Sequence, residues 1–122
     1  MISTARALHD FYSGFGIPAY TTQTVPDEAV EPYITYNLTE PDWNSPTTHY
    51  CQVWYNDTSN AAVLAKADEI VRAIGEGIKL HTDGGFILLR PDSPLVQLLV
   101  EDREHRSAYI NLQLNAFHER GI

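Results

Sequence analysis

The stretch AYINLQLNAF, residues 108–117, alternates without interruption between two kinds of side chain. Because successive side chains of a β-strand point to opposite faces of a sheet, this pattern predicts a strand with one buried and one polar face. The predicted buried face holds Ala108, Ile110, Leu112, Leu114 and Ala116, and the polar face holds Tyr109, Asn111, Gln113, Asn115 and Phe117. A sheet that is packed on one side only therefore forms the centre of the predicted fold.

Several further segments have the composition of strands. The predicted strands cover residues 33–38, 49–56, 78–82 and 86–90. The last two flank Asp83-Gly84-Gly85, which is the chemistry of a tight β-hairpin turn. Three prolines interrupt residues 17–32, where we expect a loop with at most one edge strand near residues 20–24. The apolar run 95–100 fits a strand and a short helix equally well, and residues 101–106 form a predicted charged connection.

Two segments have helical periodicity. Ser3 or Thr4 can cap a helix whose apolar residues recur at spacings of three and four, and Gly14 and Gly16 end it. The apolar positions of this helix are Ala5, Leu8, Phe11, Tyr12 and Phe15. A second helix follows residues 57–60 and ends at Gly75. Its apolar stripe consists of Val63, Leu64, Ala67, Ile70, Val71 and Ile74. The order of elements predicts one α+β domain over residues 1–122, with a mainly antiparallel sheet of four or five strands and both helices on one face.

Composition excludes several classes of function. The chain has 122 residues, 8 Lys and Arg against 16 Asp and Glu, and a formal net charge of −8. The basic residues are scattered, so we expect no specific nucleic-acid binding. No window is apolar enough for a membrane span and no leader pattern is present, so we expect no membrane association and synthesis in a cytoplasm. The single cysteine, Cys51, excludes an internal disulfide.

A search for catalytic and metal-binding motifs predicts no enzyme, no cofactor and no metal site. The five histidines, His9, His49, His81, His105 and His118, have no spacing typical of a ligand cluster. Cys51 lies within a predicted strand, where a buried thiol acts as a small apolar group. The carboxylate pairs Asp27/Glu28 and Glu101/Asp102 fall in polar connections, no G-x-S-x-G motif is present, and the glycine pairs match no phosphate-binding loop.

Surplus aromatic residues are the candidates for a subunit interface. Trp43 lies in a proline-flanked loop, Trp54 lies opposite the apolar side of its strand, and Tyr109 and Phe117 lie on the polar face of the last strand. Trp and Tyr are enriched at protein interfaces. The alternatives are that Trp43 folds over its own core and that the polar face only meets water.

The order of elements and four segments resemble the tail terminator proteins of long-tailed phages and prophages, also called tail completion or minor tail proteins. These segments are YITYNLTEPDW (33–43), residues 51–75, GGFILLRPDSP (84–94) and YINLQLNAF (109–117). The resemblance implies a structural subunit without catalytic residues. It also implies a hexameric ring that caps the head-proximal end of the tail tube, stops tube polymerisation and offers a surface for head joining.

This resemblance implies a set of partners and a location. The expected partners are further copies of the chain, the tail tube protein and the head-tail connector protein, and the expected location is the virion tail, after assembly in the bacterial cytoplasm. If acidic residues face the lumen of the ring, the charge of −8 lets DNA pass without binding. The alternatives are another head-tail connector or tube component and, from a different class, a small bacterial ligand-binding α+β domain.

Overall fold

The computed structural model describes residues 3–39, 45–100 and 102–118. Its two α-helices are α1 (Thr4–Tyr12) and α2 (Ala61–Ile74), and short 3₁₀ turns cover Ser13–Phe15 and Thr22–Thr24. The strands are β1 (Ala19–Thr21), β2 (Tyr33–Tyr36), β3 (Thr47–Asn56), β4 (Ile78–Thr82), β5 (Gly85–Val100) and β6 (His105–His118).

All six strands belong to one mixed sheet in the order β1-β2-β3-β6-β5-β4. The prediction of a mainly antiparallel sheet of four or five strands is therefore wrong. The difference lies in residues 17–32, where β1 pairs in parallel with β2. The main-chain carbonyl of Pro18 accepts a hydrogen bond of 2.8 Å from the amide of Ile34, which brings the proline-rich segment beside β2. A strand of three residues has too little alternation to be separated from a loop by its sequence.

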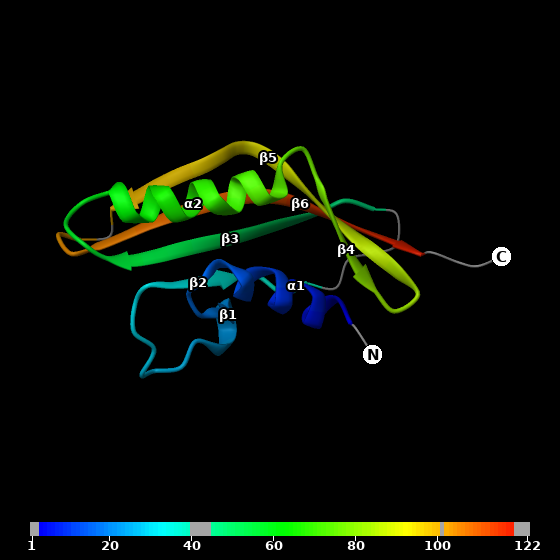
Figure 1. The fold of residues 1–122 in the computed structure, drawn as a ribbon, viewed down its shortest axis with the longest axis horizontal. Coiled ribbons are helices and arrows are strands. Elements are labelled where there is room, and N and C mark those ends of the chain that lie inside the picture. The colour runs from blue at the N-terminus through cyan, green and yellow to red at the C-terminus, as the bar shows by residue number, and fades with distance from the viewer. Residues whose placement is uncertain (1–2, 40–44, 101, 119–122) are drawn as a thin grey trace.

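Both helices lie on the same side of the sheet, on the near side in Figure 1. The helix α2 runs along β3 and β6 and contacts β3, β6 and β5, whereas α1 contacts β1 and β4, the two outermost strands in the sheet order. The sheet is therefore curled around α1. One continuous core lies between the helices and the sheet, and its largest fully buried side chains include Tyr12, Tyr36, Leu8, Ile34, Ile70, Leu112 and Leu114.

The helix and hairpin ends follow the predicted local chemistry. The Ser3 hydroxyl accepts a hydrogen bond of 3.1 Å from the Arg6 amide and caps α1. Gly75 takes a φ of 59° at the end of α2, and Gly84 takes a φ of 78° in the turn between β4 and β5. Positive φ is strained for residues with a β-carbon, which explains glycine at both positions. The β4–β5 hairpin is confirmed.

The segment 95–100, for which a strand and a helix fitted equally well, belongs to β5. This strand continues through Pro91 and Pro94, and its pairing with β6 shifts between Pro91 and Val96. Such a bulge accommodates residues that cannot join the regular hydrogen-bond ladder. The predicted charged connection shortens accordingly, because His105 and Arg106 already pair with Asn56 and Tyr55 of β3.

Candidate functional site

The strand register divides the sheet into an inner face and an outer face. Opposite residues of paired strands share a face, so Ile110 and Cys51 lie together on the inner face, against the helices. Their neighbours Tyr109 and Gln52 lie on the other side. We call this other side the outer sheet face. Its residues are Tyr20, Tyr33, Thr35, Thr48, Tyr50, Gln52, Trp54, Asn56, Lys79, His81, Phe86, Leu88, Arg90, Gln97, Leu99, His105, Ser107, Tyr109, Asn111, Gln113, Asn115 and Phe117.

The outer sheet face contains no Asp or Glu, although the chain has 16 acidic residues. The acidic residues that the structure describes lie on the helices and connections, apart from Asp92 at the β5 bulge. Charge is therefore segregated. Depletion of charged residues together with enrichment of aromatic residues is the composition of the centre of a protein interface.

Contacts between neighbouring strands hold the side chains of this face in place. Tyr50 stacks on Tyr109 with ring centroids 4.8 Å apart, and Phe86 stacks on Phe117 at 5.0 Å. The indole Nε1 of Trp54 donates a hydrogen bond of 3.0 Å to the Thr35 hydroxyl. Cross-strand pairs of this kind order the surface before any partner binds, which lowers the entropic cost of association.

Three of the four predicted interface residues lie on the outer sheet face. Trp54, Tyr109 and Phe117 are half-buried there, and Trp43 lies outside the described residues. The sequence interpretation missed Tyr50 and Phe86, the stacking partners of Tyr109 and Phe117. The alternation of β3 was a signal for Tyr50, whereas the pairing of Phe86 depends on the register of β5 against β6.

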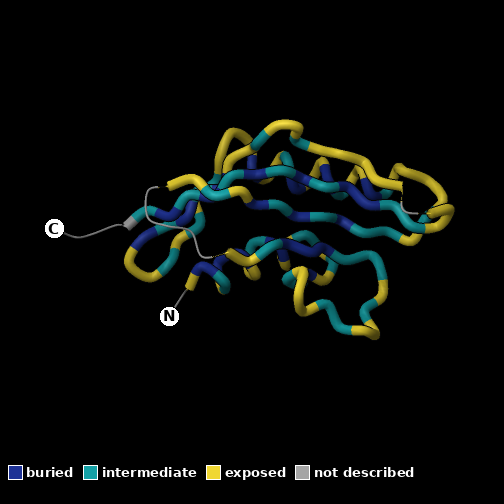
Figure 2. Tube along the Cα trace, turned by 180° about the vertical axis from the view of Figure 1, so that it is seen from behind, coloured by how far each residue is buried: buried dark blue, intermediate teal, exposed yellow. Residues whose placement is uncertain are grey.

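A second candidate contact region is the half of β5 that follows its bulge. The strand β4 pairs only with residues 85–89 of β5, so residues 96–100 pair with β6 alone among the described residues. Four large apolar residues are exposed in this segment, Val96, Leu98, Leu99 and Val100, with 58% exposure for Val100 (Figure 2). A long uncharged edge strand is a ready template for pairing with another chain.

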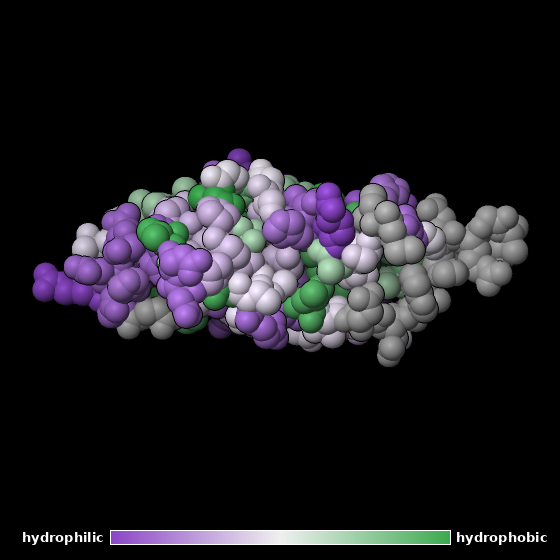
Figure 3. Space-filling model, turned by 90° about the horizontal axis from the view of Figure 1, so that it is seen from below, coloured by the Kyte–Doolittle hydropathy of each residue, from purple (hydrophilic) through white to green (hydrophobic). Residues whose placement is uncertain are grey.

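The side of the molecule that carries α1 and β1 differs from the outer sheet face. Hydrophilic side chains surround only small, separate hydrophobic patches there (Figure 3). Arg6 pairs with Asp10 on α1 at 3.1 Å, with both side chains largely exposed. Such a surface is typical of one that stays in water.

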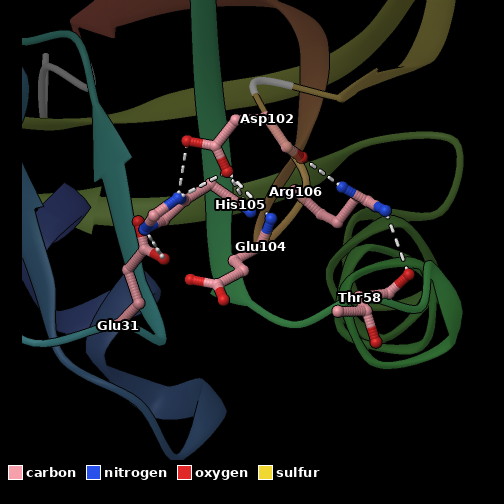
Figure 4. A network of polar contacts seen from close by, with 6 residues as sticks. All are labelled: Glu31, Thr58, Asp102, Glu104, His105 and Arg106. Carbon is pink, nitrogen blue, oxygen red and sulfur yellow. Dashed lines mark hydrogen bonds and ion pairs between the residues drawn. The ribbon is translucent and has the colours of Figure 1, made fainter.

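A small pocket lies at one corner of the outer sheet face. It has a volume of about 260 Å³ and is lined by Ala29, Val30, Glu31, Tyr33, Asn56 and His105. His105 lies between two carboxylates (Figure 4). Its Nδ1 lies 2.8 and 2.9 Å from the two carboxylate oxygens of Asp102, and its Nε2 lies 3.9 Å from Oε1 of Glu31. We call this the Glu31–His105 pocket.

The charges of the pocket are coupled. The hydrogen bond to Asp102 raises the pKa of His105, and the backbone amide of Glu104, followed by the His105 ring, lowers the pKa of Asp102. Burial raises the pKa of Glu31, and the nearby His105 opposes that rise. The arrangement favours the charged form of the His105 imidazole, whereas burial disfavours the charged form of the Glu31 carboxylate.

A second polar group of residues is enclosed within the core. The Tyr12 hydroxyl and Nε2 of His49 share a hydrogen bond of 2.8 Å, and both side chains are fully buried. Burial lowers the pKa of His49 to about 4 and raises the pKa of the Cys51 thiol to about 12. Both groups are therefore uncharged at neutral pH. A neutral, enclosed thiol is unreactive, as the sequence interpretation expected for Cys51.

The described residues include no group of three or more His, Cys, Asp or Glu side chains that could hold a metal ion. His9 is exposed on α1 and His81 is exposed on β4, where it lines an open pocket of about 370 Å³ with Lys79 and Asp10. His49 and His105 occupy the separate places described above. In the part of the chain that the structure describes, no helix is both long and apolar enough to cross a bilayer.

No protein-family model matches the chain, and a search of curated proteins finds no match.

Proposed function

We propose that this chain is a ring-forming structural subunit, a tail terminator of long-tailed phages that caps the head-proximal end of the tail tube. Two kinds of evidence support the proposal. The sequence resembles that family from about residue 30 onward, and the outer sheet face has the composition of an interface. The carrying observation is the absence of acidic residues from this face in a chain of net charge −8.

Electrostatics explains why such a face favours contact between copies. Two copies repel one another at long range because each carries the same net charge. Close contact is favoured where carboxylates are absent, and the outer sheet face and residues 95–100 are such places. A closed ring needs two different patches on each subunit, so that the contact repeats from one copy to the next. These two regions are the patches that we assign to it.

In this proposal the ring would bind the tail tube protein on one side and the head-tail connector protein on the other, in the virion tail. The proposed role involves no catalysis, no cofactor and no metal ion. Native mass spectrometry over a range of concentrations, with electron microscopy of large species, tests the proposal. We expect a closed hexamer. Long stacks would indicate a tube component instead.

A single added charge provides a sharper test. Gln52 lies near the centre of the outer sheet face, and its amide donates a hydrogen bond of 3.0 Å to the Ser107 hydroxyl. Gln52→Glu keeps the shape of the side chain but places a carboxylate on the face. We expect it to abolish ring formation and leave the monomer folded.

Ala61→Glu is the matched control, because it adds the same charge at the exposed first turn of α2, where the helix dipole favours an anion. It should assemble like the parent chain. Equal loss of assembly in both variants would show that net charge matters and the outer sheet face does not. A monomer at every concentration, stabilised against heat by a metabolite, would favour the ligand-binding domain.

A further inference from the structure

We propose that His105 is a pH-operated clasp, whose protonated ring holds residues 25–32 against one corner of the outer sheet face and whose neutral ring releases them. Residues 25–32 connect the 3₁₀ turn Thr22–Thr24 to β2 and form a loop beyond β1 and β2 (Figure 1). The clasp acts within a single chain, so it does not depend on the formation of a ring.

Residues 25–32 have few anchors on the rest of the molecule. None of them is buried, and their one backbone hydrogen bond with described residues runs from the Ala29 amide to the Pro26 carbonyl, within the segment itself. In the part of the chain that the structure describes, the ion pair of Glu31 with His105 is the only ion pair or hydrogen bond that joins this segment to another element. Segments with few buried contacts open locally at a low cost in free energy. A single contact therefore decides whether this segment stays on the sheet.

Asp102 determines which nitrogen of the His105 ring loses a proton. Nδ1 lies 2.8 and 2.9 Å from the two carboxylate oxygens of Asp102. An ionised carboxylate only accepts hydrogen bonds, so Nδ1 is the donor and keeps its proton in both charge states of the ring. The backbone amides of Glu104 and His105 hold the same carboxylate in place, at 2.8 and 2.9 Å from its Oδ1. The proton that the ring loses is therefore the one on Nε2.

The proton on Nε2 of His105 faces Glu31. Nε2 lies 3.9 Å from Oε1 of Glu31, and this oxygen is buried without a hydrogen-bond partner among the described residues. A protonated Nε2 turns a positive N–H edge toward the carboxylate (Figure 4), whereas a neutral ring turns a lone pair toward it. The loss of one proton thus replaces attraction by repulsion, at a carboxylate whose charged form burial already disfavours.

The other charges near the ring do not replace this contact. The titratable and charged groups around His105 are Glu31, Tyr33, Asp102, Glu104 and Arg106. The three carboxylates favour the charged ring, and the hydrogen bond to Asp102 contributes most to the raised pKa of His105. Burial raises the pKa of Tyr33, so its hydroxyl is uncharged at neutral pH. The Arg106 guanidinium donates instead to Asn60 and to main-chain oxygens. Among these groups, Glu31 alone belongs to residues 25–32.

The raised pKa of His105 sets the direction of the switch. The neighbouring carboxylates raise this pKa above 6.5, mainly through the hydrogen bond to one of them. The clasp is therefore complete at pH 6.5 and below, down to the pH at which Glu31 takes up a proton, and it is lost as the pH rises through the raised pKa. When the clasp opens, residues 25–32 leave the corner at which Tyr33 and Asn56 line the pocket. Both residues belong to the outer sheet face, so the uncovered part of this face grows as the pH rises.

NMR of the full chain over roughly pH 5 to 9, the range in which a histidine changes its charge, tests the clasp. The methyl signals of Ala29 and Val30 report on the segment, and the ring C–H signals of His105 report on its charge. We expect both sets of signals to titrate with one shared midpoint above pH 6.5, and the methyl groups to gain mobility on the alkaline side. Methyl signals that stay constant while His105 titrates would overturn the inference.

Glu31→Gln and Glu28→Gln are a matched pair of variants, because each removes one carboxylate from the same segment and Glu28 is exposed. In Glu31→Gln we expect the midpoint of His105 to move to lower pH and the methyl response to disappear. Glu28→Gln should titrate like the parent chain, and in His105→Ala the segment should be mobile at every pH. Equal responses of the two glutamate variants would mean that the net charge of the segment acts on His105 and the contact does not. That result would also overturn the inference, and it would leave the proposed ring untouched.

Discussion

The two faces of the sheet have the same strands but different chemistry. On β6, Ile110 is fully buried against the helices, and its neighbour Tyr109 lies half-buried on the outer sheet face, stacked on Tyr50. The inner face excludes water within the monomer. The outer face is ordered by ring stacking and free of carboxylates, so its apolar area remains available to a partner. The comparison separates residues that fold the subunit from residues that can join subunits.

The largest expected effect on stability comes from a charge placed between the inner sheet face and the helices. Ile70 of α2 is fully buried, and Ile70→Asp places an unpaired carboxylate in the core. We expect a loss of more than about 4 kcal/mol in the free energy of unfolding, which is a large part of the stability of a small domain. Circular dichroism should show an unfolded chain at room temperature.

Leu64→Asp is the control on the same helix, because Leu64 is 41% exposed. This variant should remain folded. A folded Ile70→Asp variant would contradict the assignment of the inner face.

The second effect is a pH dependence of stability that arises from His49 in the same core. His49 is fully buried, and burial lowers its pKa from 6.5 to about 4. The unfolded chain therefore binds a proton between about pH 6.5 and 4 that the folded chain does not bind. Stability from this group is present above pH 6.5 and is lost as the pH falls to about 4, by on the order of 3 kcal/mol.

Urea unfolding of the parent chain and of His49→Gln across this range measures the difference. The variant should show a flatter pH profile. Parallel profiles would mean that other groups cause the acid sensitivity.

The sharpest comparison comes from two adjacent residues of β6, of which Tyr109 gives the smallest expected effect on stability. Ile110→Ala removes a buried side chain and should cost about 2–5 kcal/mol of stability. Tyr109→Ala removes a cross-strand ring contact and should cost about 1 kcal/mol or less. Thermal unfolding measures both variants, and native mass spectrometry measures their assembly. Tyr109→Ala should lose assembly although it remains folded, and equal costs for the two residues would contradict the division into two faces.

Local patterns in the sequence predicted the elements whose structure is determined by residues close to one another in the chain. The alternation of residues 108–117 places β6 correctly, the apolar stripe with Ile70 defines α2, and Asp83-Gly84-Gly85 specifies the β4–β5 hairpin. Each of these signals depends on side-chain period or turn chemistry within a few residues. Pairing between distant segments leaves no such signal, which is why the parallel partner of β1 and the continuation of β5 beyond Pro94 were not predicted.

The candidate sites follow the same division. Trp54, Tyr109 and Phe117 were predicted as interface residues from their positions in alternating strands, and the structure places them on one face. Glu31 and His105 were not singled out as a pair, because the one precedes β2 and the other begins β6. The antiparallel pairings of β2 with β3 and of β3 with β6 bring them to the same corner.

The position of β6 between β3 and β5 also has a consequence for folding on the ribosome. Among the described strands β6 is synthesised last, yet it pairs with both β3 and β5 along nearly their whole lengths. Until it emerges, the nascent chain holds two strands without their common neighbour. The contacts between β3 and β6 are distant in sequence, and contacts of this kind slow folding. The growing chain is therefore exposed to wrong strand pairing until residues 105–118 have left the exit tunnel.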